Sequence, residues 1–297
     1  MSKPYPEKEL NFNAMALKNI FNGEPESFQG EVPEVKETMD CQTHGKVDLV
    51  YFPIYSSLKD RFNGKPAISH QVSRYCKDCL AAEAARLQSE HESEKKRKRE
   101  EAERAAFLED LEFRGVSLRN SDVRLKDIVA KNPKQQEAID AMKLMATDIN
   151  ASKRTGNLIL IGSVGTGKTM LTSGLVCDLV IDGCHPAIRR VIDIIRKMKN
   201  TWRKDSEITE DDLIRNLVGL DLLIIDEIGV QFGSDTEKMF IFDIIDGRYN
   251  KMKPTILISN LTMEGIKECI GERCIDRLRE DGGKVIAFDF DSQRGRK

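Results

Sequence analysis

The chain has 297 residues, more than an ordinary small domain holds and typical of two domains. Apolar residues make up 40% of it and charged residues 32%, which excludes wholesale disorder but predicts a long solvated segment beside a globular part. The formal net charge of −2 excludes a chain that is basic throughout. Any nucleic-acid contact must therefore come from a local cluster of basic residues.

The N-terminal sequence MSKPYPEKEL lacks the basic and apolar regions of a signal peptide, and no stretch approaches about 18 apolar residues. We therefore expect a cytoplasmic protein with no membrane partner and with reduced cysteines. Residues 1–38 show no sustained period and are predicted to be a flexible segment. A short partner-binding helix is predicted around Ala14–Phe21 within it.

Two short motifs with metal-binding side chains lie in a turn-rich module predicted for residues 39–80. Cys41-Gln-Thr-His44 and Cys76-Lys-Asp-Cys79 each place two such side chains three residues apart. Tetrahedral Zn²⁺ takes four donors of this kind, so the pattern predicts a structural zinc site. The alternative is a set of reduced thiols near an unrelated surface histidine. The other cysteines are interpreted as buried or half-buried residues: Cys177, Cys184, Cys269 and Cys274.

Residues 81–114 are predicted to form a charged helical connector, because they contain good helix formers and neither glycine nor proline. Charged residues occur nearly all round this helix, which is typical of a solvated element. Its basic cluster Lys95–Arg99 has two interpretations. It is either a solubilising face balanced by neighbouring glutamates or a nucleic-acid contact.

From residue 115 to 297, apolar runs alternate with helical segments. This pattern predicts an α/β domain of three layers around a parallel sheet. A helix is expected over Pro133–Ser152, with proline at a permitted first-turn position. Buried strands are expected over Asn157–Ile161, Leu222–Ile225, Thr255–Ser259 and Val285–Phe290.

The segment that follows the first of these strands fits the phosphate-binding pattern G-x-x-x-x-G-K-[ST]. Its glycines let backbone N–H groups surround a phosphate chain, and the following helix adds its positive N-terminal end. Lys168 is predicted to reach the β- and γ-phosphates of ATP, and Thr169 to hold Mg²⁺. The predicted nucleotide-binding residues are Gly162, Ser163, Val164, Gly165, Thr166, Gly167, Lys168 and Thr169.

Further polar residues are predicted to complete a catalytic site. The run LLIIDE delivers Asp226 and Glu227 to the carboxyl end of a strand, where Asp226 is expected to orient Mg²⁺ and Glu227 to polarise the attacking water. Asn260 ends the next strand and is predicted to contact the γ-phosphate or that water. Arg273 and Arg277 lie one helical turn apart. One of them is a candidate arginine finger for a neighbouring subunit's ATP, and a solvated basic helix face is the alternative.

Together these motifs resemble those of the AAA+ ATPases, with residues 162–169 as Walker A, 222–227 as Walker B, Asn260 as sensor I and 273–277 in the box VII region. The chain is more closely similar to replicative helicase loaders of the DnaC type. That similarity rests on RRVIDIIRKMKNTW, on GERCIDRLR and on a short C-terminal tail, from which we expect no helical lid domain.

The resemblance implies an ATPase that assembles into a ring or spiral, binds single-stranded DNA and loads a hexameric replicative helicase, with hydrolysis as the switch for release. It places Lys197 and Lys199 near DNA phosphates, and Trp202 either on a base or against the core. Two other functions remain open. One is an IstB-like transposition helper that binds duplex DNA and recruits a transposase, and the other is a non-catalytic, ATP-dependent adaptor.

Overall fold

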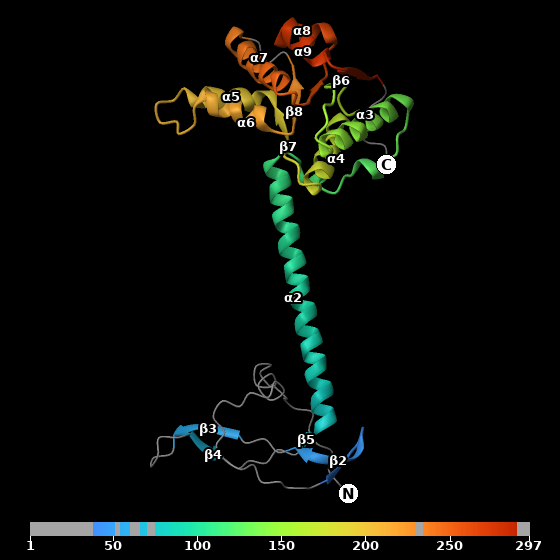
Figure 1. Cartoon of the computed structure of the whole chain (residues 1–297), viewed down its shortest axis with the longest axis vertical. Coiled ribbons are helices and arrows are strands. Elements are labelled where there is room, and N and C mark those ends of the chain that lie inside the picture. Colours follow the sequence, from blue (N-terminus) through green and yellow to red (C-terminus); the bar gives the residue numbers. More distant parts are fainter. Residues whose placement is uncertain (1–37, 51–53, 60–65, 70–74, 230–233, 290–297) are drawn as a thin grey trace. The chain divides into compact units, whose positions relative to one another are not determined.

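The computed structural model describes residues 38–50, 54–59, 66–69, 75–229 and 234–289 (Figure 1). The chain divides into two compact units, residues 1–103 and 104–297, and each is described by itself. The helix predicted around Ala14–Phe21 lies outside the described residues. None of the described helices is long and apolar enough to cross a membrane.

The first unit contains short antiparallel strands and most of a long helix. One small sheet has the order β1-β2-β5, and a separate pair joins β3 to β4. Gly45 has a φ of +72°, a left-handed geometry that glycine adopts without steric cost at the start of β2. The strands are β1 (Thr38–Cys41), β2 (Gly45–Val50), β3 (Ile54–Lys59), β4 (Pro66–Ser69) and β5 (Tyr75–Cys76).

Helix α2 runs from Lys77 to Phe113 and contains all but the last residue of the connector predicted over 81–114. Four members of its basic cluster each lie within 2.8–3.8 Å of a glutamate one turn away, and all of these side chains are more than half exposed. Such pairs each stabilise a solvated helix by about 0.2–0.5 kcal/mol. This arrangement favours the interpretation of the cluster as a balanced, solubilising face. The pairs are Lys96–Glu100, Arg97–Glu101, Lys98–Glu94 and Arg99–Glu103.

In the described part of the second unit, a five-stranded parallel sheet has the order β10-β6-β9-β8-β7. The four strands predicted from apolar runs are confirmed, with ends that differ by up to three residues. Strand β7 was missed because only its first three residues are buried at the sheet edge. The strands are β6 (Leu158–Gly162), β7 (Pro186–Arg190), β8 (Leu222–Ile228), β9 (Thr255–Ser259) and β10 (Lys284–Phe288).

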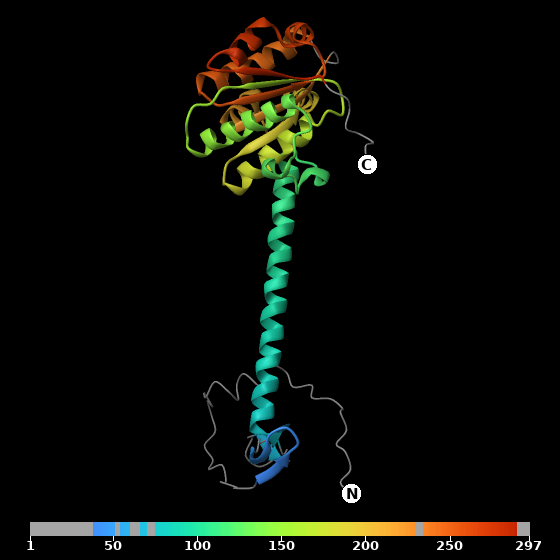
Figure 2. The same ribbon diagram turned by 90° about the vertical axis from the view of Figure 1, so that its right-hand side faces the viewer.

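Helices cover both faces of this sheet (Figure 2). Alternate strand residues face opposite sides, so Leu222 and Ile224 pack with α3 and α4, whereas Leu223 and Ile225 pack with α5 to α9. The predicted three-layer α/β fold is therefore confirmed. The helices are α3 (Pro133–Asn150), α4 (Lys168–Ile181), α5 (Val191–Thr201), α6 (Glu210–Gly219), α7 (Asp235–Asn250), α8 (Met263–Ile270) and α9 (Glu272–Arg279), with short 3₁₀ turns η1 (Leu118–Asn120) and η2 (Leu125–Asp127).

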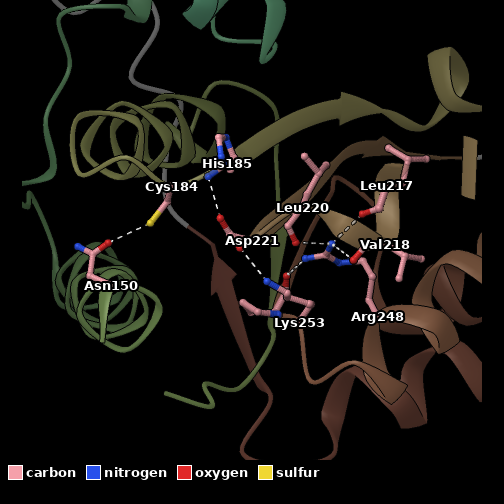
Figure 3. Close-up of polar contacts among 10 residues, drawn as sticks. Asn150, Cys184, His185, Leu217, Val218, Leu220, Asp221, Arg248 and Lys253 are labelled. Atoms are coloured by element: carbon pink, nitrogen blue, oxygen red, sulfur yellow. Dashed lines mark hydrogen bonds and ion pairs between the residues drawn. The ribbon is translucent and has the colours of Figure 1, made fainter. Parts of the chain in front are cut away.

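Arg248 of α7 is fully buried near the amino ends of β8 and β9 (Figure 3). Its guanidinium donates to the carbonyl groups of Leu217, Val218, Leu220 and Pro254 and to the hydroxyl of Thr255, at 2.5–3.4 Å. Burial lowers the pKa of Arg248 to about 9, which leaves the group charged at neutral pH. One side chain thus joins α7 to the segments that enter two central strands.

Candidate nucleotide site

Three of the predicted catalytic residues lie at or after the carboxyl ends of neighbouring strands of the sheet. Lys168 comes after β6, Asn260 directly after β9, and Glu227 lies near the end of β8. Because these strands are parallel and β9 lies between the other two, their carboxyl ends meet at one edge. In open α/β sheets this edge is where ligands bind.

The glycines of the loop after β6 have the backbone geometry that the pattern requires. Gly162, Gly165 and Gly167 have φ values of +140°, +87° and +95°, which side chains disfavour. A Cβ atom on Gly162 would also lie 2.2 Å from the carbonyl oxygen of Phe288 in β10. Gly162 therefore serves both the loop and the packing of the neighbouring strand.

Lys168 is the first residue of α4, and its side chain folds back over the loop. Its Nζ donates to the carbonyl oxygens of Gly162 and Ser163, each at 2.8 Å, and to Oγ1 of Thr166 at 3.2 Å. Only 7% of Lys168 is exposed, and burial lowers the pKa of its ammonium. The charge is thus held at the loop by oxygen atoms that a phosphate group can replace.

Thr169 and Asp226 meet across the gap between α4 and β8. Oγ1 of Thr169 donates to Oδ2 of Asp226 at 3.0 Å, while the backbone N–H of Glu227 donates to Oδ1 at 2.7 Å. Asp226 is 7% exposed, and burial raises the pKa of its carboxyl group. The contact joins a hydroxyl and a carboxylate oxygen, the hard donors that suit Mg²⁺, so the residues fit the predicted ion.

Glu227 occupies an irregular position in β8. The pairing with β9 shifts register between Ile225 and Ile228, and Glu227 has a φ of +60°. A left-handed residue other than glycine costs about 1–3 kcal/mol, and residues strained in this way cluster at functional sites. The bulge leaves Glu227 exposed in a strand whose other residues are buried. Asn260 is also exposed at the same edge of the sheet.

The two predicted arginines of α9 have different surroundings. Nε of Arg277 lies 3.1 Å from Oδ1 of Asp246, and its guanidinium carbon lies 4.3 Å from the ring centre of Tyr249. Arg273 is exposed and forms no ion pair with another described residue. Arg277 is thus held within its own domain, whereas Arg273 is available to a neighbouring molecule.

Arg190 was not predicted from the sequence, yet it lies beside the acidic pair. It ends β7 in register with Asp226 of β8. A bond to Asp193 at 2.7 Å raises the pKa of Arg190, and the negative charges of Glu227 and Asp226 raise it further. A prediction of strand β7 from the sequence would have placed Arg190 at this edge of the sheet. The strand has too few apolar residues to be predicted in that way.

The basic residues predicted to contact DNA lie on and just after α5. Lys197 is exposed, whereas Nζ of Lys199 lies 2.8 Å from Oε1 of Glu237 in α7. Trp202 is 55% exposed, and its Nε1 donates to Oε2 of Glu210 at 3.0 Å. The alternative in which Trp202 packs against the core is therefore wrong.

Three of the four predicted zinc ligands come together in the first unit. Cys41 Sγ lies 3.5 Å from Cys79 Sγ, and Nδ1 of His44 lies 3.7 Å and 3.3 Å from these two sulfur atoms. Donors that each sit about 2.0–2.3 Å from one tetrahedral ion have separations of this size. Backbone amides of Thr43 and His44 lower the pKa of the Cys41 thiol to about 6. The side chain of Cys76 lies outside the described part of the chain.

The remaining cysteines have the predicted surroundings. Cys177, Cys269 and Cys274 are buried and Cys184 is half-buried. Burial raises the pKa of all four thiols, and that of Cys274 reaches about 12. These cysteines belong to the packing of the second unit.

A family profile described as IstB-like ATP binding protein matches residues 82–294, which is more than two thirds of the chain. The chain belongs to this family. The match includes most of α2 together with the strands and helices of the nucleotide site. In this IstB-like chain, the phosphate-binding loop and the Thr169–Asp226 contact lie within the matched region.

Curated relatives of the IstB-like chain include replicative helicase loaders. It is 38% identical over 160 residues to the replicative helicase loader DnaC of Buchnera aphidicola subsp. Schizaphis graminum, and 39% identical over 140 residues to that of Escherichia coli strain K12. These matches cover 54% and 47% of this chain. They span 64% and 57% of the relatives, less than two thirds of their length.

A solved structure described as the DnaC helicase loader has the same fold. It matches with a TM-score of 0.51 at 20% identity and covers 58% of this chain and 99% of that one. At this identity the likeness concerns the fold alone. It agrees with the AAA+ P-loop architecture of the five-stranded sheet and its flanking helices.

Proposed function

We propose that this IstB-like protein is an ATPase that loads a hexameric replicative helicase onto single-stranded DNA and uses hydrolysis as the switch for release. The similarity to curated DnaC loaders supports the loading role. The contact between Thr169 and Asp226, beside the exposed Glu227, carries the catalytic part of the proposal. A site that only held ATP would not need a second carboxylate that can polarise water.

In this proposal the loop residues hold ATP and the strand ends act on water. Backbone N–H groups of the loop surround the phosphates, and Lys168 exchanges its loop oxygens for the β- and γ-phosphates. Thr169 and Asp226 hold Mg²⁺, which when bound neutralises charge on the phosphate oxygens. Glu227 orients the attacking water and accepts its proton, so that ATP and water yield ADP and phosphate. Asn260 holds the γ-phosphate or this water.

Assembly completes the proposed site. We assign the arginine finger to Arg273, because it is exposed while Arg277 is bound to Asp246. In a ring or spiral, Arg273 reaches the ATP of the adjacent subunit and stabilises the charge that develops on the γ-phosphate. Lys197, Lys199 and Trp202 lie toward single-stranded DNA, where the lysines meet phosphates and the indole stacks on a base.

The module over residues 39–80 is proposed to hold one structural Zn²⁺ through Cys41, His44, Cys76 and Cys79. The convergence of the three described donors supports this assignment. A module of this size gains much of its folding free energy from the metal. It would display a surface to the helicase or to DNA, joined through the connector 81–114 to an ATPase domain over 115–297. Metal analysis of purified protein should find one zinc per chain, and Cys41→Ser with Cys79→Ser should lose it.

The proposed function is tested with Lys168→Ala and Glu227→Gln. The first should abolish ATP binding, and the second should retain binding but lose hydrolysis that is stimulated by single-stranded DNA. Glu227→Gln should also trap a complex with a hexameric helicase in a pull-down from source cells, because release requires hydrolysis. Helicase loading that proceeds unchanged in both variants would exclude the switch.

A second function is supported by the family description itself. An IstB-like transposition helper would bind duplex DNA and recruit a transposase, so it should prefer duplex over single-stranded DNA at matched length and salt. The proposed loader should show the opposite preference. Measurable ATP turnover with DNA present would exclude the third function, a non-catalytic adaptor.

A further inference from the structure

One long-range ion pair joins the candidate DNA-binding helix α5 to α7. Nζ of Lys199 lies 2.8 Å from Oε1 of Glu237, with the lysine side chain 54% exposed and the glutamate side chain 12% exposed. Glu237 is also the third residue of α7 and forms a capping box with Ser234. The pair therefore attaches α5 to the first turn of α7.

The first turn of α7 follows the Walker B strand closely. Six residues, 229–234, separate Ile228 at the end of β8 from Asp235 at the start of α7. Glu227 at the tip of β8 already has a strained φ of +60°. A restraint on the start of α7 is therefore a restraint close in the chain to the carboxylate that is proposed to activate water.

A DNA phosphate and the carboxylate of Glu237 compete for the ammonium group of Lys199. A phosphate that approaches α5 from solvent meets an exposed ammonium whose partner is a mostly buried carboxylate. Sharing the ammonium would bring two anions together, which is unfavourable where one of them is shielded from water. DNA binding through Lys199 thus favours the state in which this ion pair is broken.

We propose that the Lys199–Glu237 ion pair is a DNA-sensitive latch: it restrains hydrolysis in the free protein, and a phosphate of single-stranded DNA releases it by binding Lys199. The inference rests on the proposed function, since it requires DNA binding by α5 and hydrolysis stimulated by DNA. It adds the contact through which DNA binding affects hydrolysis at the catalytic site.

The latch makes a prediction that a structural ion pair does not. If DNA binding breaks the ion pair, part of the binding free energy is used for that step. A variant in which the pair is already broken should therefore bind DNA more tightly. Glu237→Gln keeps an oxygen acceptor for the cap of α7 and frees Lys199. It should bind a single-stranded oligonucleotide about fivefold more tightly, the lower end of typical coupling between binding sites, and it should hydrolyse ATP faster than wild type without DNA.

Lys199→Met supplies the second variant. It also breaks the pair, so its DNA-free hydrolysis should rise as in Glu237→Gln and its further stimulation by DNA should fall toward one. It removes a phosphate contact at the same time, so its DNA affinity should not increase. The two variants together separate release of the latch from the loss of a charge.

A matched control is present in α6. Asp212 is likewise the third residue of a capping box, and its Oδ1 lies 2.7 Å from Nη2 of Arg215. This pair lies within one helix, and the carboxylate is 44% exposed. Arg215→Met should leave DNA affinity, DNA-free hydrolysis and the unfolding midpoint at wild-type values.

Three outcomes are distinguishable. Tighter DNA binding and faster DNA-free hydrolysis in Glu237→Gln, with Arg215→Met unchanged, would support the latch. Wild-type protein that responds to single-stranded DNA, with Glu237→Gln and Lys199→Met both at wild-type DNA-free rates, would overturn the latch and leave the proposed function standing. Wild-type protein that neither binds single-stranded DNA nor responds to it would overturn the proposed function and the latch with it.

Discussion

The two ends of the parallel sheet each bury a cation, and they hold it in different ways. At the carboxyl ends of the strands, Lys168 binds oxygen atoms of its own loop, none more than six residues away. At the amino ends, Arg248 binds carbonyl groups up to 31 residues away. Burial lowers the pKa of both side chains.

The difference lies in what can replace each cation. Gly162 is half-buried and Ser163 is exposed, so water can donate to their carbonyl oxygens when Lys168 turns to a phosphate. The carbonyl groups around Arg248 belong to segments that enter the core, and the guanidinium fits them with donors in fixed directions. The contacts of Lys168 can therefore be exchanged for contacts with a ligand, whereas those of Arg248 are permanent and stabilise the fold.

Removing Arg248 should have the largest effect on stability. Arg248→Met removes a donor from four carbonyl groups, of which Pro254 keeps a bond from the N–H of Leu223 at 3.5 Å and Leu220 is only half-buried. The two buried orphans, on Leu217 and Val218, cost about 1–3 kcal/mol each, so the free energy of unfolding should fall by at least about 2 kcal/mol. Lys253→Met is the control from the same region, because its half-exposed pair with Asp221 contributes about 1 kcal/mol or less. Urea titrations of both variants measure the difference, and equal losses would contradict the contrast.

Removing Lys168 should change activity rather than stability. Lys168→Met should lower ATP turnover by about 100-fold or more, equivalent to about 2.7 kcal/mol, because the charge that meets the phosphates is lost. Its free energy of unfolding should stay within about 1 kcal/mol of wild type, since the loop oxygens can bind water. A loss of stability as large as that of Arg248→Met would break the comparison.

Burial of the ionised Asp226 carboxylate should lower the stability of the fold at neutral pH. Burial raises its pKa above the unfolded value, so the ionised form destabilises the fold at neutral pH and this effect fades as the pH falls through the raised pKa. Asp226→Asn should therefore unfold at a higher temperature than wild type at pH 7, with the difference vanishing in acid. An unfolding midpoint of Asp226→Asn below that of wild type at pH 7 would contradict this account.

Arg273 and Arg277 of α9 should give the smallest effects on stability. Arg277→Met should cost about 1 kcal/mol, because it loses a partly exposed ion pair and a ring contact. Arg273→Met should stay within about 0.5 kcal/mol of wild type yet lower hydrolysis in the assembled protein. Mixing it with Lys168→Met subunits provides a check, since active sites that form between the two variants should regain turnover.

Much of the fold could be predicted because the signals are local. The apolar runs of β6, β8 and β9 are long enough to indicate buried strands, and their confirmed positions place the glycine loop and the acidic pair at one edge. The edge strand β7 is only partly buried and lacks such a run, so it was missed together with Arg190. Local pattern fails where a strand contributes little to the core.

By itself the sequence determined the phosphate loop, the strand pattern and the pair Asp226 and Glu227, because each depends on neighbouring residues and on the geometry of a few backbone units. The tertiary structure decided which charged groups meet: Arg248 with distant carbonyl groups, Arg277 with Asp246, and Lys199 with Glu237. These partners are separated by about 30 residues or more in the chain. Long-range contacts of this kind follow from how helices pack on the sheet, which no short stretch of sequence encodes.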